Sequence, residues 1–296
     1  MLQGITLTLL AGATAWFACL WQSSPSMAPV GFAAIAAVYA AALALEFVAL
    51  RRVNRGDPVP QAGGAALGRA WLAETLQAPR VFGWRQPFRW NAIPDQLICP
   101  NNGGPRRGVV FVHGFFCNRG FWTPWLRLLR ASGHPFVAVN LEPLFSSIDD
   151  YVPIVDQAVT AVMRATGLAP LVVCHSMGGL ATRAWLRAGK NAARVHHVVT
   201  IGTPHQGTWL ARRSRLANGR QMALASHWLR QLNADAATQP QPPFTCWYSN
   251  CDNVVFPSSC AAMAGADNRL VEGAAHVELG FHPLVMQETC ALLSRG

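Results

Sequence analysis

Hydrophobic and polar positions divide the chain into two long uncharged runs followed by a region of short alternating elements. The runs are Leu2–Trp21 and Ala28–Leu45, and neither contains a charged residue. A helix rises about 1.5 Å per residue and the hydrocarbon core of a bilayer is roughly 30 Å thick, so each run can cross or nearly cross a membrane. The pattern predicts a hairpin of two transmembrane helices over residues 1–52.

Two other interpretations compete for these runs. A cleaved signal peptide over Met1–Leu20 would need a basic start, which the chain lacks, and the residues before Cys19 are Trp, Phe and Ala, a poor cleavage context. A buried hairpin in a helical core would account for the alanine-rich second run, but nothing nearby in the sequence offers such a core. The transmembrane interpretation is the one we favour.

Arginines predict the orientation of this hairpin. Arg51, Arg52 and Arg55 follow the second run, whereas the turn between the runs has no Lys or Arg. The positive-inside rule then places both chain ends, and the domain that follows, in the cytoplasm at a bacterial inner membrane. Glu46 lies near the same end, and we interpret it as a residue that reaches the interface and not as a buried ionic switch.

Composition supports a membrane protein with one soluble domain. The chain has 51% hydrophobic and 13% charged residues, which is apolar for its length. Residues 53–80 begin rich in Pro, Gly and Ala and are predicted to be a linker with a short helix at about 70–77. The remaining residues, 81–296, are enough for one core of ordinary size.

Alternating elements in this domain predict its fold class. Helical patterns at 121–130, 148–166 and 177–188 lie between apolar, β-rich runs. Such strands separated by helices imply an α/β fold with a mostly parallel sheet covered on both faces, and function at the carboxyl ends of the strands. The predicted strands are 108–112, 135–139, 170–174, 195–201, 244–248 and 269–271.

A serine stands where a predicted strand meets a predicted helix. The stretch LVVCHSMGGL places Ser176 after the strand, with Gly178 and Gly179 opening the helix. Small residues there allow a sharp turn and close packing, so the serine is held out over the sheet as in a nucleophile elbow. The usual pattern has glycine where this chain has Cys174, itself a small residue. The competing interpretation is a serine that only caps the helix.

A serine nucleophile needs a base, and the base needs an orienting acid. Both follow the serine in this type of fold. Asp252 follows an apolar strand in the turn CDNVVFP, and His276 follows the last strand in a loop of small residues. We predict these two as acid and base, and we interpret His282, which precedes a proline, as structural. Alternatives are Asp267 or Asp235 for the acid and His282 for the base.

The oxyanion donors are expected in the loop after the first strand. His113 and Gly114 begin that loop, and the glycine lets the amide of Phe115 point at a developing oxyanion beside the amide of Met177. Substrate contacts are expected from the same loop and from the start of the segment that follows the fourth strand. The expected contacts are His113, Gly114, Phe116, Trp209 and Leu210.

Taken in order, the stretches FVHGFF, CHSMGG, IGTPHQGT, CDNVVFP and AAHVELGFHP resemble the bacterial triacylglycerol lipase and esterase branch of the α/β-hydrolase superfamily. The resemblance covers roughly residues 82–296. It implies an α/β-hydrolase fold with a helical cap at about 205–240, here preceded by two transmembrane helices, and it makes His205 a residue that orders the loop into the cap. The triad and oxyanion positions that it implies are Ser176, Asp252, His276, Phe115 and Met177.

The resemblance implies a serine hydrolase of carboxylic esters, most simply lipid or acylglycerol esters, that needs no metal or organic cofactor. Two alternatives stay open. One is another acyl transfer with the same triad, such as thioester hydrolysis, polyester depolymerisation or transfer to an alcohol. The other is a catalytically idle hydrolase fold that serves as a membrane-binding module. The sequence leaves the oligomeric state undetermined.

The net charge of +10 does not point to nucleic acid, because the arginines are scattered and no nucleic-acid motif accompanies them. A basic surface next to anionic lipid accounts for the charge. Residues 209–232 interleave Trp, Leu and Met with arginines, which predicts an amphipathic helix in the cap that meets the bilayer. The eight cysteines lack metal-ligand spacing and are expected to be thiols in the cytoplasm.

Overall fold

Six strands form one parallel sheet in the order β2-β1-β3-β4-β5-β6. All six predicted strands are present, and the largest differences are at β4 and β6, each of which starts two residues from its predicted position. The computed structural model describes residues 1–98, 106–189 and 191–294. The strands are β1 Val109–Val112, β2 Phe136–Ala138, β3 Leu171–His175, β4 His197–Ile201, β5 Phe244–Tyr248 and β6 Asp267–Leu270.

The order of the strands brings two loops together. From β1 the chain moves outward to β2 at the edge of the sheet, and then returns to β3 on the other side of β1. β1 and β3 are in register, with Val112 opposite Cys174. Ligands of open parallel sheets bind at such a reversal point, beyond the carboxyl ends of the strands. The loop after β1 and the turn after β3 therefore face each other.

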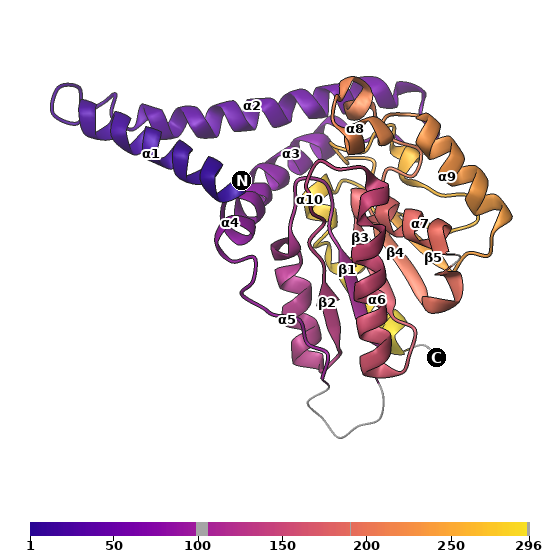
Figure 1. Ribbon diagram of the computed structural model, residues 1–296. Coiled ribbons are helices and arrows are strands. Elements are labelled where there is room, and N and C mark those ends of the chain that lie inside the picture. Colours follow the sequence, from indigo (N-terminus) through magenta and orange to yellow (C-terminus); the bar gives the residue numbers. More distant parts are fainter. Residues whose placement is uncertain (99–105, 190, 295–296) are drawn as a thin grey trace.

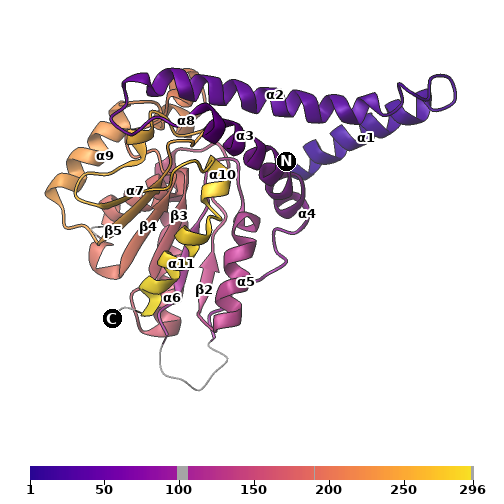
Figure 2. The same cartoon turned by 180° about the vertical axis from the view of Figure 1, so that it is seen from behind.

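Helices cover both faces of the sheet (Figures 1 and 2). Residues of β1 alternate between the two faces, with Val110 and Val112 in one apolar cluster and Val109 and Phe111 in the other. This burial on both sides explains why the strands are apolar without interruption. One face is covered by α6 Val152–Thr166, α7 Met177–Gly189 and α9 His227–Thr238, and the other by α5 Thr123–Ser132 and α11 Pro283–Ala291.

Short helical turns complete the described chain. The helix predicted over 148–166 is a 3-10 turn that continues into α6, and the one predicted over 121–130 begins with a 3-10 turn and ends at Ser132. The turns are η1 Asn54–Gly56, η2 Pro79–Arg85, α4 Gln86–Phe88, η3 Arg119–Trp122, η4 Ile148–Tyr151, η5 Asn191–Arg194, η7 Ser258–Ala261, α10 His276–Leu279 and η8 Leu292–Ser294.

The two uncharged runs form helices α1 (Leu2–Leu20) and α2 (Val30–Val53), which make a hairpin that extends away from the sheet (Figure 1). Both are long and apolar enough to cross a membrane, and only 6% and 11% of their most apolar windows are buried. A helix from the core of a soluble protein would be mostly buried, so the buried core hairpin is wrong. A pair of membrane spans or a signal sequence fits these helices.

Helix α3 (Gly64–Ala78) begins six residues before the predicted short helix. Leu67 and Ala70 are buried in a third apolar cluster that also contains Phe47 and Leu50 of α2. This packing extends the helix into the glycine- and alanine-rich stretch that the sequence predicted as linker. α3 lies beneath α2 and beside the carboxyl ends of the strands (Figure 1).

The sequence predicted one amphipathic helix over 209–232 between β4 and β5, and this prediction is wrong. The segment is divided into η6 (Trp209–Arg213), α8 (Ala217–Gln221) and α9. Ser214 has extended backbone and ends η6, and Leu216 has extended backbone and precedes α8. Ser226 starts α9 by accepting a hydrogen bond from the amide of Leu229. Hydrogen bonds from the backbone amides of Leu216 and Leu229 to nearby serine hydroxyls interrupt the helix that the spacing of apolar residues predicts.

Candidate active site

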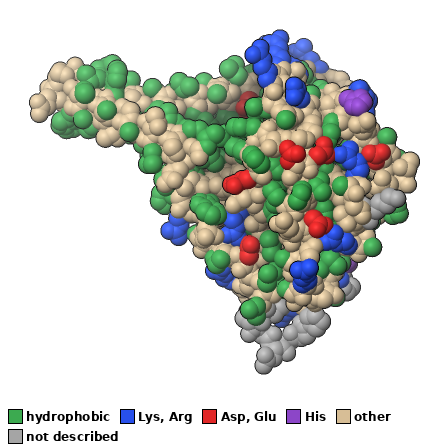
Figure 3. Space-filling model, in the orientation of Figure 1, with side chains coloured by type: hydrophobic (Ala, Val, Ile, Leu, Met, Phe, Trp, Pro, Cys, Tyr) green, Lys and Arg blue, Asp and Glu red, His purple; other side chains and the backbone are tan. Residues whose placement is uncertain are grey.

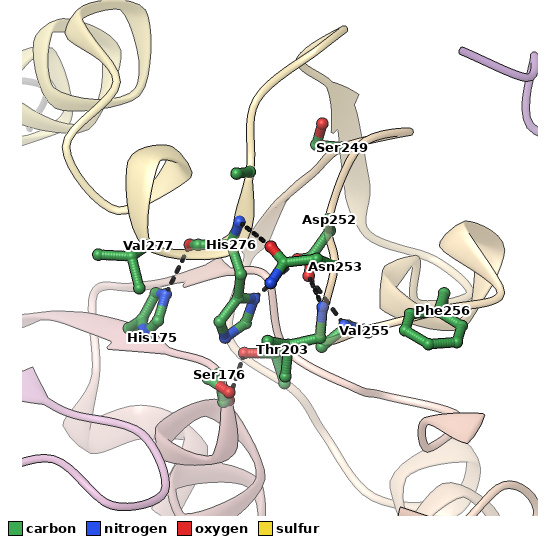
Figure 4. A network of polar contacts seen from close by, with 12 residues as sticks. His175, Ser176, Thr203, Ser249, Asp252, Asn253, Val255, Phe256, His276 and Val277 are labelled. Atoms are coloured by element: carbon green, nitrogen blue, oxygen red, sulfur yellow. Dashed lines mark hydrogen bonds and ion pairs between the residues drawn. The ribbon is translucent and has the colours of Figure 1, made fainter. Parts of the chain in front are cut away.

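Ser176 lies on a strained turn between β3 and α7. Its φ is 53°, in the left-handed region that favours glycine, and 7% of the residue is exposed. The turn is fixed on both sides, because the Ser176 amide donates to the carbonyl of Ile201 at 2.9 Å and the Thr203 hydroxyl donates to the Ser176 carbonyl at 2.8 Å (Figure 4). A serine that only capped a helix would not need this conformation.

Two glycines allow the chain to pack closely around the serine. A Cβ atom on Gly178 would lie 2.2 Å from the Val112 carbonyl oxygen, so α7 can start against β1 only with glycine there. A Cβ atom on Gly114 would lie 2.7 Å from the Cβ of Ser176. The predicted oxyanion loop therefore touches the serine, as the topology of the sheet requires.

Asp252 and His276 lie together, although 23 residues separate them in the chain. The Nδ1 atom of His276 is 2.9 Å from Oδ2 of Asp252 (Figure 4). The other carboxylate oxygen of Asp252 accepts the amides of Val254 and Val255 at 2.9 and 2.8 Å, which fixes the direction of the carboxylate. Gly202 leaves room for the pair, since a Cβ there would lie 3.0 Å from the Asp252 carboxylate.

The electrostatics of His276 suit a general base that becomes an acid. Burial by itself lowers the pKa of His276, but the charge and hydrogen bond of Asp252 outweigh it and raise that pKa above its ordinary value. The same hydrogen bond fixes the proton on Nδ1 and leaves Nε2 free to accept another proton. In Figure 4 the ring of His276 lies between Asp252 and Ser176.

His175 supports this histidine from the other side. Its Nε2 atom lies 3.1 Å from the carbonyl oxygen of His276, and its ring stacks on Phe121 with centroids 4.3 Å apart. Burial, followed by the charge of His276, holds the pKa of His175 well below its ordinary value. His175 is therefore neutral and donates from Nε2, which fixes the backbone of the predicted base.

The amides of Phe115, in the loop after β1, and Met177, at the start of α7, are the predicted oxyanion donors. Among the described residues, neither amide donates to a protein acceptor, and Phe116 turns the loop with a φ of 60°. His113, predicted to contact substrate, is instead fully buried: its Nε2 accepts from the Leu141 amide at 3.0 Å, so its Nδ1 donates to the Gly114 carbonyl. Burial lowers the pKa of His113 to about 4, so this neutral ring orders the loop.

A cavity of about 620 Å³ opens beside the oxyanion loop. Phe116 lines it, and the rings of Phe115, Phe116 and Phe145 contact one another with centroids 5.8 to 6.4 Å apart. Its walls mix apolar side chains with amides, and the first turn of α1 closes one side. The lining residues include Leu2, Gln86, Trp90, Phe116, Asn118, Leu141 and Leu144.

Trp209 and Leu210 are half-buried against the third apolar cluster. The ring of Trp209 lies 5.7 Å from that of Phe256, and its amide donates to the Phe256 carbonyl at 2.9 Å. The side chains of Trp209 and Leu210, predicted to contact substrate, are thus packed against the cluster that contains Phe47 and Leu50 of α2. Their role in substrate binding stays a prediction.

The alternative acids and bases lie elsewhere. Asp267 pairs with Arg269 on β6 at 2.7 Å, and Asp235 lies on α9 at 3.9 Å from Arg187. His282 precedes α11, and the fully buried His205 contacts Thr200 and Arg183, as a loop-ordering residue would. None of these is in contact with the Asp252–His276 pair.

Cys174 is fully buried at the position where the family pattern has glycine. Its Sγ lies 3.1 Å from the hydroxyl of Thr182 on the facing turn of α7, so the thiol fills the space under the elbow. The seven described cysteines are unpaired, and Cys99 lies outside the described residues. In the described ranges no group of three or more His, Cys, Asp or Glu side chains is arranged to hold a metal ion.

Sequence reasoning missed the residues that hold the site from outside. Thr203 lies in the stretch IGTPHQGT and Asn253 lies in the stretch CDNVVFP, directly after Asp252. Both motifs were used above, but no role was assigned to these two residues. Asn253 accepts a hydrogen bond from the His276 amide at 3.2 Å. Glu46 and Glu74 contact the same loops from about 200 residues earlier in the chain, and no local pattern could have signalled them.

Comparison with known proteins identifies the family and the fold of this chain. A profile described as "Alpha/beta hydrolase family" matches residues 109–280. The mature form of the Bacillus licheniformis lipase BlEst2 is similar in structure, with a TM-score of 0.59 and 15% identity over 66% of this chain and 95% of that one. Aspergillus fumigatus lipase B has a TM-score of 0.53 and 18% identity over 61% of this chain and 51% of that one. No curated protein matches the chain. At these identities the likeness shows the fold, and the expected α/β-hydrolase fold is confirmed.

Proposed function

This chain belongs to the alpha/beta hydrolase family, and from that premise we propose that it is a serine hydrolase of carboxylic esters whose triad is Ser176, His276 and Asp252. Lipase structural neighbours support ester hydrolysis at a coarse level. The observation that carries the proposal is the buried His276–Asp252 hydrogen bond of 2.9 Å beside a serine held at positive φ.

The proposed reaction has two steps. Nε2 of His276 takes the hydroxyl proton as the Ser176 oxygen bonds to the ester carbonyl carbon, and the amides of Phe115 and Met177 donate to the resulting oxyanion. The carbon–oxygen bond to the alcohol breaks, and His276 protonates the leaving alcohol. Water then attacks the acyl-enzyme with His276 again as base, and a carboxylic acid is released.

Lipid or acylglycerol esters are the substrates that the surroundings favour. The cavity beside Phe116 is closed on one side by the first turn of α1, a candidate membrane helix. Exposed arginines gather above the sheet near the end of α2 (Figure 3). We call the exposed arginines of the end of α2, of η1 and of the segment from η6 to α8 the basic surface: Arg51, Arg52, Arg55, Arg212, Arg213, Arg215 and Arg220. Such a surface suits anionic lipid.

A fluorophosphonate probe tests the triad on the detergent-solubilised full chain. The parent should be labelled, Ser176→Ala should not, and His276→Ala and Asp252→Asn should each lower turnover by at least about a thousandfold. An unlabelled parent would support an idle hydrolase fold. A series of esters of increasing chain length, with a thioester beside it, separates lipid ester hydrolysis from the other acyl transfers.

The proposed topology is a helical hairpin in the bacterial inner membrane with the hydrolase domain in the cytoplasm. The exposed apolar surfaces of α1 and α2 and the arginines after α2 support it. Protease added to intact spheroplasts should leave the hydrolase domain uncut. Digestion of the domain would reverse the orientation, and a cleaved first helix would favour a signal sequence.

A further inference from the structure

The end of α2 (residues 46–53) and α3 form what we call the base of the N-terminal hairpin. It packs directly behind Asp252, the proposed acid, and His276, the proposed general base. Phe47 and Leu50 of α2 are buried in one cluster with Cys251 and Ala275, the residues immediately before Asp252 and His276. Residues of this base lie outside the part that matches the family profile, which begins at 109. The hydrolase domain therefore has its two catalytic loops supported by a segment that the family pattern does not describe.

Glu74 of α3 reaches the backbone that follows His276. The Val277 amide donates to its two carboxylate oxygens at 3.1 and 3.2 Å, and the Glu278 amide donates at 3.3 Å. Only 2% of Glu74 is exposed. A buried carboxyl group is costly unless it is hydrogen-bonded, and hydrogen bonds of amides to a carboxylate are among the stronger ones. The contact therefore fixes the loop on which the imidazole is mounted.

Glu46 of α2 reaches the same histidine through an amide side chain. The oxygen of Asn253 accepts from the His276 amide at 3.2 Å, which leaves the nitrogen of Asn253 in need of an acceptor. That acceptor is the Glu46 carboxylate, at 2.7 Å. Asn253 is 1% exposed, so its side-chain amide has little access to water. Two carboxyl groups from two helices thus converge on the main chain at residues 276–278.

We propose that Glu46 and Glu74 are positioning residues that hold His276 in its catalytic orientation from the base of the N-terminal hairpin. The proposal rests on the proposed function, since it assigns His276 as the base. A catalytic group must be held within about 0.5 Å and 10–20° of its productive geometry, and residues outside the site supply that constraint. Loss of such a constraint lowers turnover more than it weakens the binding of a small ester.

The test compares Glu74→Gln and Glu46→Ala with Glu288→Gln, all in the detergent-solubilised full chain. Glu288 lies on α11 and pairs with Arg269 at 3.4 Å, so its variant is a matched loss of a carboxylate away from the site. With p-nitrophenyl butyrate, each of the first two variants should lower kcat by about tenfold and leave KM within about twofold. Both oxygens of Glu74 accept from backbone amides, so Glu74→Gln turns an NH2 donor toward one of them, whereas Glu46→Ala removes the acceptor of Asn253. The control should behave as the parent.

Glu46→Gln separates charge from hydrogen bonding. The Gln oxygen can still accept from Asn253, so kcat should recover to within about twofold of the parent. The groups that face His276 are Asp252, His175, Glu74 and Glu46. Because the charge of Glu46 helps raise the pKa of His276, its removal should move the acidic limb of the kcat/KM profile to lower pH. A structural role alone would not move that limb.

The outcomes distinguish this proposal from the function on which it rests. Should the parent hydrolyse the ester while Glu74→Gln and Glu46→Ala stay within twofold of Glu288→Gln, the positioning role is overturned and the triad stands. A parent that is neither active nor labelled at Ser176 overturns the function itself. If Glu74→Gln fails to fold, the Glu46→Ala and Glu46→Gln pair decides: a loss with Ala that Gln restores supports the role, and equal turnover overturns it.

Discussion

The outer part of the N-terminal hairpin and its base are made of similar residues but lie in opposite surroundings. Val38 of α2 is 69% exposed and Leu9 and Leu10 of α1 are each 48% exposed, whereas Phe47 and Leu50, further along α2, are 5% and 1% exposed. The outer part contacts little besides the other helix of the hairpin, whereas the base packs against the loops of Asp252 and His276 (Figures 1 and 2).

The difference shows that one continuous helix can have two kinds of surroundings along its length. An apolar side chain gains by leaving water whether it enters lipid or protein, so composition cannot tell the two destinations apart. Polar contacts distinguish the part of α2 that packs on protein from the part that does not. Glu46 accepts a hydrogen bond from Asn253, and the Trp71 indole of α3 donates to the Ala40 carbonyl of α2 at 2.9 Å. The base belongs with the hydrolase domain by its contacts and with the hairpin by its sequence.

The largest expected effect comes from the same substitution made on both sides of this boundary. Leu50→Ala removes a fully buried side chain beside Phe256 and should cost about 2–5 kcal/mol of stability. Leu10→Ala, in the outer part on α1, where the residue is 48% exposed, should cost less than about 0.5 kcal/mol. Thermal unfolding in detergent measures both. Equal losses would show that the base is no more part of the protein core than the outer hairpin is.

A second prediction uses pH to probe the buried carboxyl group of the base. Burial raises the pKa of Glu74 from 4.5 to about 7. The folded state then holds this proton where the unfolded chain has released it, so the group's contribution to stability falls as pH rises from about 4.5 to 7. The change is on the order of 3 kcal/mol.

Glu74→Gln cannot ionise and should lack this dependence. The unfolding temperature of the parent relative to that of Glu74→Gln should therefore decline between pH 5 and pH 8. Asp252 and His276 remain in both proteins, so their titration largely cancels in the comparison. A constant difference across this range would mean that Glu74 is solvated, and the base would be less tightly closed than the structure has it.

The smallest expected effect concerns the basic surface at the end of the base. If it meets anionic lipid, anionic vesicles should raise activity on long-chain esters by a few-fold, since each arginine near such a surface contributes about 1 kcal/mol. Reversal of Arg212, Arg213 and Arg215 to Glu should abolish that rise and spare a short soluble ester. An equal response of variant and parent would restrict membrane contact to the hairpin.

Local patterns predicted most of the geometry of the candidate site. The elbow at Ser176 and the loop at Gly114 follow from strand ends and glycines, and the pairing of Asp252 with His276 follows from where the strands of a parallel sheet must end. The amphipathic segment after residue 208 was predicted less well, because Ser214 and Ser226 bond to nearby backbone and interrupt the helix. A prediction from the spacing of apolar residues alone takes no account of such competing hydrogen bonds.

The sequence by itself determined the parallel sheet, the turn that carries Ser176, the strand ends after which Asp252 and His276 lie, and two long apolar helices. Only the tertiary structure decided that the second run ends in protein, that α3 closes over the carboxyl ends of the strands, and that Glu46 and Glu74 reach the loop of His276. The reason is physical. Periodicity and glycine act over a few residues, whereas a buried carboxyl group takes its partners from whatever backbone the packing of distant helices brings within hydrogen-bond distance.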